Sequence, residues 1–388
     1  MKDFVYDPVE VPKGDSTREV SDGMLIVGDR GLILQVKSRD PSADRDSAKV
    51  SRWAMKKASE AVRQVQGTRR TLETTKVTLR SRRGHELVLE PPQTWAGVVL
   101  LDLDPVPDGL RICSDDDDTI IMTLADWHEL HYMILSTSGV IDYVERVVEQ
   151  GIENDLGHEW DRYRRFAEAD SISANKPGYE PVLPLNPLSD NDRICANVLD
   201  EWIDSDIAAT PVDNGRYTAD QVRSAVETLD SIPILLRVQI GEAMLSRVRD
   251  SVRSGEPRST LLTIDSPARL LFFTDVSGNW NNKWRYLEPH LTTYTAVRHE
   301  QLEEHYGPGE TLLLARVERD DGSVWRTFVR IAGSAKALSL PPDVRWGICA
   351  QFGILTAEGI CDLASISGVE KCPCGAGGEF RDCHGPDR

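Results

Sequence analysis

The chain has 388 residues, of which 40% are hydrophobic and 28% are charged, and its formal net charge is −18 at pH 7. This length predicts two or three domains, and the apolar content is sufficient for globular cores. The acidic balance excludes binding to nucleic acids or anionic membranes through overall charge, although it permits a local basic groove.

The hydropathy and the cysteine content predict a cytoplasmic protein. No segment approaches the roughly eighteen consecutive apolar residues of a membrane span. The first residues, MKDFVYDPVEV, lack the basic and apolar regions of a signal peptide. The seven cysteines are odd in number, which argues against a disulfide framework. We therefore expect a cytoplasmic location and no membrane insertion.

Residues 1–174 predict a mixed α/β domain. The segment SDGMLIVGDRGLILQVKSRD, residues 21–40, contains two apolar, β-favouring runs around the turn GDRG and predicts a hairpin. Residues 47–66 place apolar side chains at helical spacing and predict an amphipathic helix. Further along the chain, the pattern predicts a hairpin at 76–90, a buried strand at 96–104, a strand at 119–124, and helices at 125–136 and 139–152. The run DDDD at 115–118 predicts a solvated acidic loop.

The rest of the chain predicts a linker and an α+β domain. Residues 175–192 contain four prolines and are typical of a linker. Residues 193–368 predict helices followed by strands, with Thr218 as a helix N-cap and DDGS as a hairpin turn. The segment 278–290 has interleaved aromatic and basic residues, which fits either a structural loop or a base-stacking loop. The fold class is therefore a multidomain combination of α/β and α+β, and no function is assigned to residues 193–368.

The last twenty residues, 369–388, predict a small zinc knot. Cys372, Cys374, Cys383 and His384 supply four soft ligands within thirteen positions, and glycines between them let the chain fold back. Four protein ligands fill a tetrahedral zinc site and leave no position for a substrate water, so the zinc would be structural. So short a segment cannot bury a core, and metal binding would supply its folding energy. The alternative is an unstructured tail with unrelated cysteines.

This tail resembles the SEC-C motif, a zinc-binding segment first described in the SecA translocation ATPase. The positions that fit the motif are Cys372, Pro373, Cys374, Gly375, Gly377, Phe380, Cys383 and His384. Gly378 and Glu379 stand where the motif usually has lysines, so its basic face is weakened. The resemblance implies a bound Zn²⁺ and a docking role toward a protein partner or nucleic acid. No phosphate-binding GxxxxGK[ST] loop occurs in the chain, which excludes the SecA motor itself.

Polar residues on the first predicted hairpin form a candidate catalytic site. Gln35 and Lys37 alternate with Val36, so they share one face of their strand, and Asp22 stands at the start of the neighbouring strand. A carboxylate and an amide oxygen are hard ligands that suit Mg²⁺ or Mn²⁺. A nearby lysine would orient the attacking water and stabilise charge on a phosphodiester in metal-assisted hydrolysis.

The same segment, about residues 15–105, resembles the PD-(D/E)xK nuclease superfamily, in particular its Mrr-like and NERD-type branches. On that resemblance Asp22 matches the motif aspartate, Gln35 the E/Q position and Lys37 the motif lysine. The superfamily usually adds a glutamate from an N-terminal helix, whereas the residues before Asp22 look extended, so Glu19 is the candidate replacement. The resemblance implies a restriction-endonuclease-like mixed sheet flanked by helices, in a magnesium-dependent nuclease.

Residues 43–86 carry twelve Lys or Arg and five Asp or Glu, a local balance of +7 in an acidic chain. Such a patch is what phosphate contacts require, although a solvated helix face would look the same. The candidate nucleic-acid-binding residues are Lys56, Lys57, Arg63, Arg69, Arg70, Arg82 and Arg83.

Two functions remain open at the level of sequence. The first is a nuclease, a hydrolase acting on nucleic acid, most simply DNA, by analogy in bacterial defence or DNA processing. The second is a non-catalytic adaptor in which a degenerate nuclease fold is combined with a zinc tail that recruits a protein. The nuclease requires the Asp22 carboxylate and the Lys37 ammonium to converge within about 6 Å. The adaptor does not.

Overall fold

The structure is a computed structural model of the chain. It describes residues 4–6, 10–13, 16–19, 21–40, 42, 46–81, 86–89, 94–114, 116–151, 154–173, 183–203, 218–263, 268–276, 284–319, 321–333, 355–356 and 359–360. By contacts the chain divides into two compact units: unit 1 comprises Met1–Ala196 and Pro211–Val238, and unit 2 comprises Asn197–Thr210 and Gln239–Arg388. Both units combine helices with sheets, as the sequence predicts.

A mixed five-stranded sheet forms the centre of unit 1. Its strand order is β1-β4-β5-β8-β10. These strands are β1 (Val5–Tyr6), β4 (Gly23–Val27), β5 (Arg30–Ser38), β8 (Thr94–Asp102) and β10 (Thr119–Thr123). β4 lies between β1 and β5 and pairs antiparallel with both, whereas β5, β8 and β10 run parallel. The predicted hairpin is confirmed as β4–β5, and Gly28 takes a positive φ of 63° in its turn.

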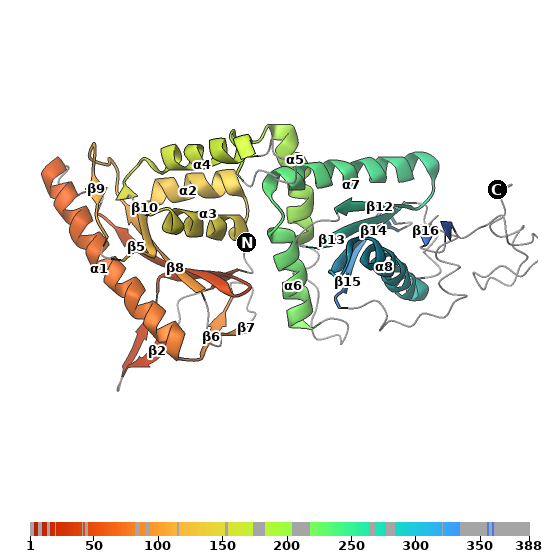
Figure 1. Cartoon of the computed structure of the whole chain (residues 1–388), viewed down its shortest axis with the longest axis horizontal. Helices are drawn as coiled ribbons and strands as arrows, with labels where there is room; N and C mark the ends of the chain where they lie inside the picture. Colours follow the sequence, from red (N-terminus) through yellow and green to blue (C-terminus); the bar gives the residue numbers. More distant parts are fainter. Residues whose placement is uncertain are drawn as a thin grey trace, which may run out of the picture. The chain divides into compact units, whose positions relative to one another are not determined.

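Helices cover both faces of this sheet (Figure 1). They are α1 (Ser47–Thr74), α2 (Leu124–Ile134), α3 (Thr137–Glu149) and α4 (Glu159–Ser173). α1 lies on one face, and its buried stripe of Val and Ala packs in a core with Ile33, Val99 and Ile121 of the sheet. α2, α3 and α4 lie on the other side of the sheet in Figure 1. The result is an α/β/α arrangement around the parallel strands.

Local chemistry explains where α1 begins and how closely it approaches the sheet. The Asp46 side chain accepts a hydrogen bond from the backbone N–H of Lys49 at 2.9 Å and caps the helix. At Gly97 of β8 a Cβ atom would lie 2.3 Å from Oγ1 of Thr119 and 2.5 Å from Cγ1 of Val65. Glycine therefore permits the contact between α1 and β8 that a larger residue would prevent.

Short strands and two further helices complete unit 1. The strands are β2 (Glu10–Lys13) with β3 (Ser16–Glu19), β6 (Val77–Arg80) with β7 (Glu86–Leu89), and β9 (Arg111–Ile112) with β11 (Asn154–Asp155). The helices are α5 (Asp190–Glu201), most of which lies in this unit, and α6 (Ala219–Asp230). The Thr218 N-cap is confirmed and forms a capping box with Gln221.

The position of α6 shows why unit 1 extends past residue 193, where the sequence predicts the second domain to begin. The carboxylate of Asp230, at the end of α6, accepts hydrogen bonds from the backbone N–H groups of Thr137 and Ser138 in the first turn of α3. Arg237 approaches the same carboxylate at 3.5 Å. These buried charge-assisted contacts hold α6 against the first 196 residues.

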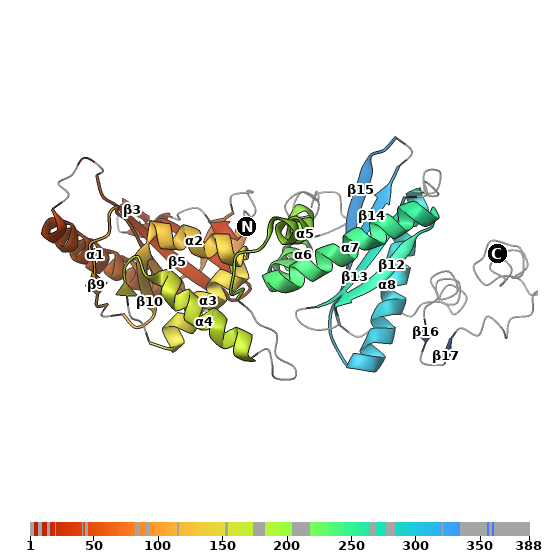
Figure 2. The ribbon, with the colours of Figure 1, turned by 90° about the horizontal axis from the view of Figure 1, so that it is seen from above.

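Unit 2 contains a four-stranded sheet with the order β12-β13-β14-β15. Its elements are β12 (Arg258–Thr263), β13 (Arg269–Asp275), α8 (Trp284–Tyr306), β14 (Thr311–Glu318), β15 (Val324–Ile331) and the short pair β16 (Leu355–Thr356) and β17 (Gly359–Ile360); α7 (Ile234–Ser254) leads into them. α8 packs its buried face against β13, β14 and β15. Figure 2 shows α7 and α8 on either side of this sheet.

The structure differs from two local predictions. Helix α8 begins at Trp284, inside the segment 278–290 that the sequence assigns to a loop. Its side chains Leu287, Leu291 and Tyr294 are fully buried, and this tertiary burial outweighs the unfavourable Pro289. The loop 115–118 is not simply solvated, because Asp116 is 8% exposed and pairs with Arg69 at 3.1 Å.

Among the helices that the structure describes, none has the length and apolar character to cross a bilayer.

Candidate functional site

The hairpin β4–β5 brings Asp22, Gln35 and Lys37 together at one edge of the sheet. Gly23 of β4 pairs with Leu34 of β5. Next to this pair, the backbone N–H of Asp22 donates a hydrogen bond to the Leu34 carbonyl at 3.1 Å. Gln35 and Lys37 alternate with Val36 along β5, so they share the face on which Ile33 meets α1. The three side chains therefore meet where β4 begins and β5 ends.

The distances among these groups are short. Nζ of Lys37 lies 3.7 Å from Oδ2 of Asp22, and it donates to Oε1 of Gln35 at 3.3 Å. The ammonium–carboxylate separation is inside the roughly 6 Å that a nuclease site requires. The sequence could predict the shared strand face, but only the pairing of the two strands determines that Asp22 reaches it.

The backbone fixes the orientation of the carboxylate. The N–H of Val36 donates to Oδ2 of Asp22 at 2.6 Å, a short charge-assisted bond. The Lys37 side chain is 19% exposed and that of Asp22 is 38% exposed, so both are accessible at the surface. Oδ1 of Asp22 has no hydrogen-bond partner among the described residues. One carboxylate oxygen is thus held in place while the other remains available to a ligand.

The donor set fits a hard divalent cation in part. Asp22 offers a carboxylate oxygen and Gln35 an amide oxygen, and Mg²⁺ is commonly held by one or two protein oxygens completed by water and substrate phosphate. Among the described residues there is no group of three His, Cys, Asp or Glu side chains that could hold a metal. The two oxygens that the described part of the chain places together here are those of Asp22 and Gln35.

Several predicted residues lie at the limits of what the structure describes. Glu19 ends β3, and the structure describes it through its backbone only. Arg82 and Arg83 lie outside the described residues, between β6 and β7. The predicted zinc ligands Cys372, Cys374, Cys383 and His384 also lie outside them.

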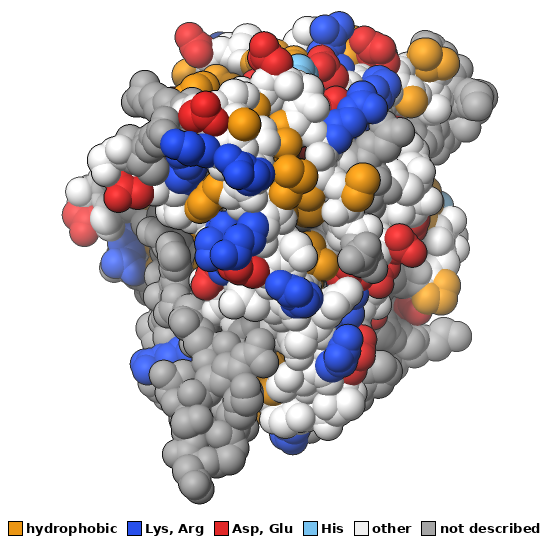
Figure 3. All heavy atoms as spheres, turned by 90° about the vertical axis from the view of Figure 1, so that its left-hand side faces the viewer, with side chains coloured by type: hydrophobic (Ala, Val, Ile, Leu, Met, Phe, Trp, Pro, Cys, Tyr) orange, Lys and Arg blue, Asp and Glu red, His pale blue; other side chains and the backbone are white. Residues whose placement is uncertain are grey.

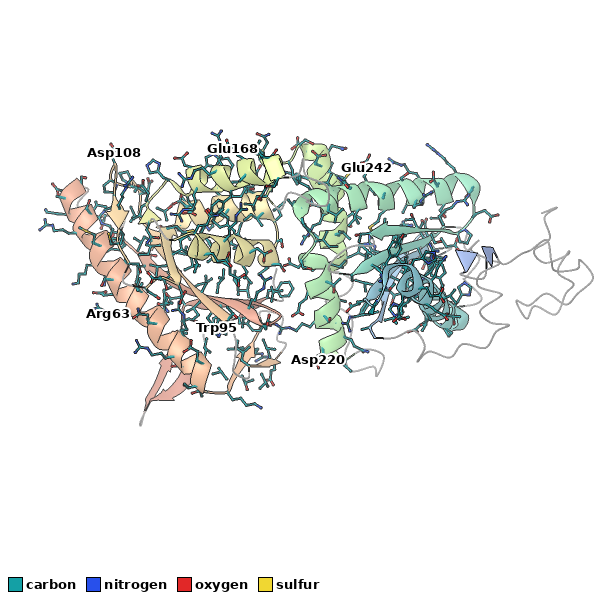
Figure 4. The ribbon with its side chains drawn as sticks, in the orientation of Figure 1. Arg63, Trp95, Asp108, Glu168, Asp220 and Glu242 are labelled. Carbon is teal, nitrogen blue, oxygen red and sulfur yellow. The ribbon has the colours of Figure 1, made fainter. Side chains whose placement is uncertain are left out.

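Most basic residues of α1 form one exposed stripe, whereas Lys57 and Arg69 lie elsewhere on the helix. At 100° per residue, the exposed cations of this helix fall within an arc of about 60°. We call this set the α1 cation stripe; it consists of Lys49, Arg52, Lys56, Arg63 and Arg70. The buried side chains of α1 face the sheet, so the stripe faces away from it, as Arg63 does in Figure 4. Figure 3 shows this side of the molecule, with Lys and Arg side chains distributed over it.

Three predicted nucleic-acid-binding residues have acidic partners. Nζ of Lys57 lies 2.7 Å from one carboxylate oxygen of Glu60, and Nζ of the exposed Lys56 lies 4.0 Å from the other. The guanidinium of Arg69 is 13% exposed and is held by Asp116 and Asp118, at 3.1 and 3.3 Å. Its charge is therefore largely compensated by the acidic loop.

Two members of the stripe, Lys49 and Arg52, are not among the residues predicted from the sequence. The signal was present in the spacing of 49, 52, 56, 63 and 70, which repeats at three, four and seven residues as one face of a helix requires. Comparisons with protein-family models, with curated proteins and with solved structures found no match. The functional argument therefore depends on the geometry of the chain itself.

Proposed function

We propose that unit 1 is a metal-dependent nuclease that hydrolyses phosphodiester bonds, with DNA as its substrate. The observation that supports this most strongly is the convergence of Asp22, Gln35 and Lys37 at one end of the β4–β5 hairpin. The mixed sheet with helices on both faces is also what the resemblance to PD-(D/E)xK nucleases implies.

Each residue would have a distinct role. The Lys37 ammonium would donate hydrogen bonds to the attacking water and to a phosphate oxygen, where negative charge increases in the transition state. Gln35 holds this ammonium through its amide oxygen, and the Val36 N–H holds the Asp22 carboxylate. These contacts preorganise the site before substrate binds, so less reorganisation is needed during the reaction.

Asp22 and Gln35 would hold a Mg²⁺ or Mn²⁺ ion through their side-chain oxygens. Such an ion supplies Lewis-acid stabilisation of the phosphodiester and lowers the pKa of water. Glu19 is a candidate for an additional carboxylate in this site.

The α1 cation stripe supplies the nucleic-acid contacts in this proposal. Its positions are separated by 21 residue steps along the helix, from Lys49 to Arg70. This corresponds to about 32 Å at 1.5 Å per residue, close to one turn of B-DNA. The overall charge of −18 opposes such binding, so affinity would depend on this local patch.

A non-catalytic adaptor is the second candidate, and specific observations favour it. Among the described residues no three His, Cys, Asp or Glu side chains form a metal-binding group, and few carboxylates mean weak metal binding. An isolated pair such as Asp22 and Lys37 also occurs as a simple surface salt bridge, worth about 0–1 kcal/mol. In this alternative, the zinc tail would recruit a chaperone, a ribosome or an effector protein.

Cleavage of plasmid DNA and of single-stranded DNA, with and without Mg²⁺, tests the proposal. Lys37→Ala should slow cleavage by about 10²-fold or more, because it removes one preorganised electrostatic group. Lys76→Ala is the matched control, since Lys76 is an exposed lysine just beyond α1. It should leave the rate unchanged, and circular dichroism should show both variants folded.

Asp22→Asn tests the metal role separately. It should raise the Mg²⁺ concentration required for cleavage, or abolish cleavage, because a charged ligand is lost. Asp29→Asn changes an exposed aspartate in the turn at the opposite end of the same hairpin and should not alter the Mg²⁺ requirement. Cleavage that persists undiminished in Lys37→Ala would exclude this lysine from the site. Absence of metal-dependent cleavage by the wild type would favour the adaptor.

For the whole chain, we place the nuclease in DNA processing or bacterial defence, with the C-terminal zinc knot as its docking segment. The support for the knot is the spacing of Cys372, Cys374, Cys383 and His384.

A further inference from the structure

A pocket in unit 1, between α3 and α4, has a strongly basic lining. Its volume is about 350 Å³, and Arg146, Arg162 and Arg165 all contribute to its wall. We call it the arginine pocket. α3 and α4 lie across the sheet from α1, so the pocket is distinct from the site at Asp22 and Lys37 (Figure 1). The size is within the range of small-molecule sites, about 300–1,000 Å³.

Two of the arginines are held in place by buried carboxylates that do not line the pocket. Nη1 of Arg146 donates to both carboxylate oxygens of Asp170, at 2.8 and 3.0 Å. Nη1 of Arg162 lies 3.2 Å from Oε2 of Glu159, and the hydroxyl of Tyr143 donates to the other oxygen, Oε1. These contacts fix each guanidinium through one terminal nitrogen.

The remaining donors of these groups have no described partner. For Arg146 and Arg162, the hydrogen bonds to described residues all involve Nη1, which leaves Nε and Nη2 without a partner there. Arg162 is only 8% exposed, yet its side chain contributes to the pocket wall. Arg165 is exposed and makes no hydrogen bond or ion pair with any described residue.

The charge balance of the pocket favours an anion. Three guanidinium groups line the pocket, and the carboxylates of Glu159 and Asp170 pair with only two of them, Arg162 and Arg146. Burial raises the pKa of Glu159 above its ordinary value. Buried arginines are usually fully paired, and a cluster with an excess charge at a cavity is typical of an anion site.

We infer that the arginine pocket binds the terminal phosphate group of a small molecule. Guanidinium groups present planar pairs of N–H donors that match phosphate oxygens, and a phosphate monoester carries enough charge and acceptors for several of them. The pocket wall also contains Phe166 and Val147, and the guanidinium of Arg146 lies 4.3 Å from the Phe166 ring centre. These apolar surfaces would contact the organic part of the ligand. This inference does not depend on the nuclease proposal.

Titration calorimetry of the full-length protein tests the inference, at constant ionic strength, with inorganic phosphate, AMP and adenosine as probes. AMP and phosphate should bind, and adenosine, which lacks the phosphate, should bind at least 10-fold more weakly than AMP. Arg165→Ala should weaken AMP binding by about 10- to 100-fold, the usual effect of losing a hydrogen bond to a charged group. Arg165 is exposed and has no described partner, so this variant should fold as the wild type does.

The neighbouring residue provides a matched control. Arg164 is exposed, pairs with Glu168 at 3.3 Å, and is not part of the pocket wall. Figure 4 shows Glu168 on the outer side of α4. Arg164→Ala removes the same charge and should change AMP affinity less than two-fold. Equal losses in Arg164→Ala and Arg165→Ala would overturn the inference, because binding would then follow net charge. Absence of phosphate and AMP binding to the wild type, or equal binding of AMP and adenosine, would also overturn it; the arginines would then serve only to join α3 and α4.

Discussion

Replacement of the three arginines in the α1 cation stripe should change how DNA binding depends on salt. The perturbation is the triple variant Arg52→Ala, Arg63→Ala and Arg70→Ala. All three side chains are exposed on one face of α1, so their removal leaves the buried face of the helix intact. Alanine has the highest helix propensity, so α1 should persist.

The expected magnitude follows from counterion release. Each phosphate contact contributes about −0.9 to the slope of log K against log salt concentration for duplex DNA. If all five members of the stripe contact phosphates, the wild-type slope is about −4.5, and the triple variant should retain about −1.8. The affinity ratio between wild type and variant should therefore be about 40-fold larger at 50 mM salt than at 200 mM salt.

Fluorescence anisotropy with a labelled duplex, at four or more salt concentrations, measures these slopes. A control triple variant, Arg111→Ala, Arg164→Ala and Arg249→Ala, removes the same charge from exposed positions on other elements. It should keep the wild-type slope. An equal reduction of the slope in both triple variants would refute the assignment of the phosphate contacts to α1, and so would an unchanged slope in the stripe variant.

Three further predictions concern stability and metal content. Burial lowers the pKa of His290 from 6.5 to about 4, so the unfolded chain takes up this proton at a higher pH than the folded chain does. The free energy of unfolding should fall by about 3 kcal/mol between pH ~6.5 and ~4, and denaturant titrations should show this loss in the wild type but not in His290→Gln. Gly97→Ala should destabilise the protein by about 1–3 kcal/mol, because the new Cβ would lie 2.3 Å from Oγ1 of Thr119. Gly23→Ala is the control and should not destabilise the protein, because the nearest atom to its new Cβ is 3.8 Å away. Equal effects of the two substitutions in thermal unfolding would contradict the close packing of α1 on β8. Metal analysis of the purified protein should find one Zn²⁺ per chain and a clear loss in Cys372→Ser; zinc well below one equivalent in the wild type would contradict a zinc knot.

The sequence by itself determined the elements whose stability is local. The hairpin β4–β5 follows from two β-favouring runs around a turn, and α1 follows from its apolar spacing and the Asp46 cap. The Thr218 N-cap was also predictable, because a cap and the first turn of its helix are only three residues apart. The shared face of Gln35 and Lys37 was predictable for the same reason, since strand geometry alone places alternate side chains together.

Only the tertiary structure decided which distant groups meet. Strand pairing brings Asp22 to Lys37, and helix packing places Arg69 beside Asp116. Helix α8 was not predictable because its stability comes from burial in the core of unit 2, which local propensity does not report. The arginine pocket gives no signal in the sequence, because Arg146 and Arg162 resemble ordinary surface arginines until α3 and α4 pack together. Charges far apart in the chain interact through space, so their partners depend on the fold as a whole.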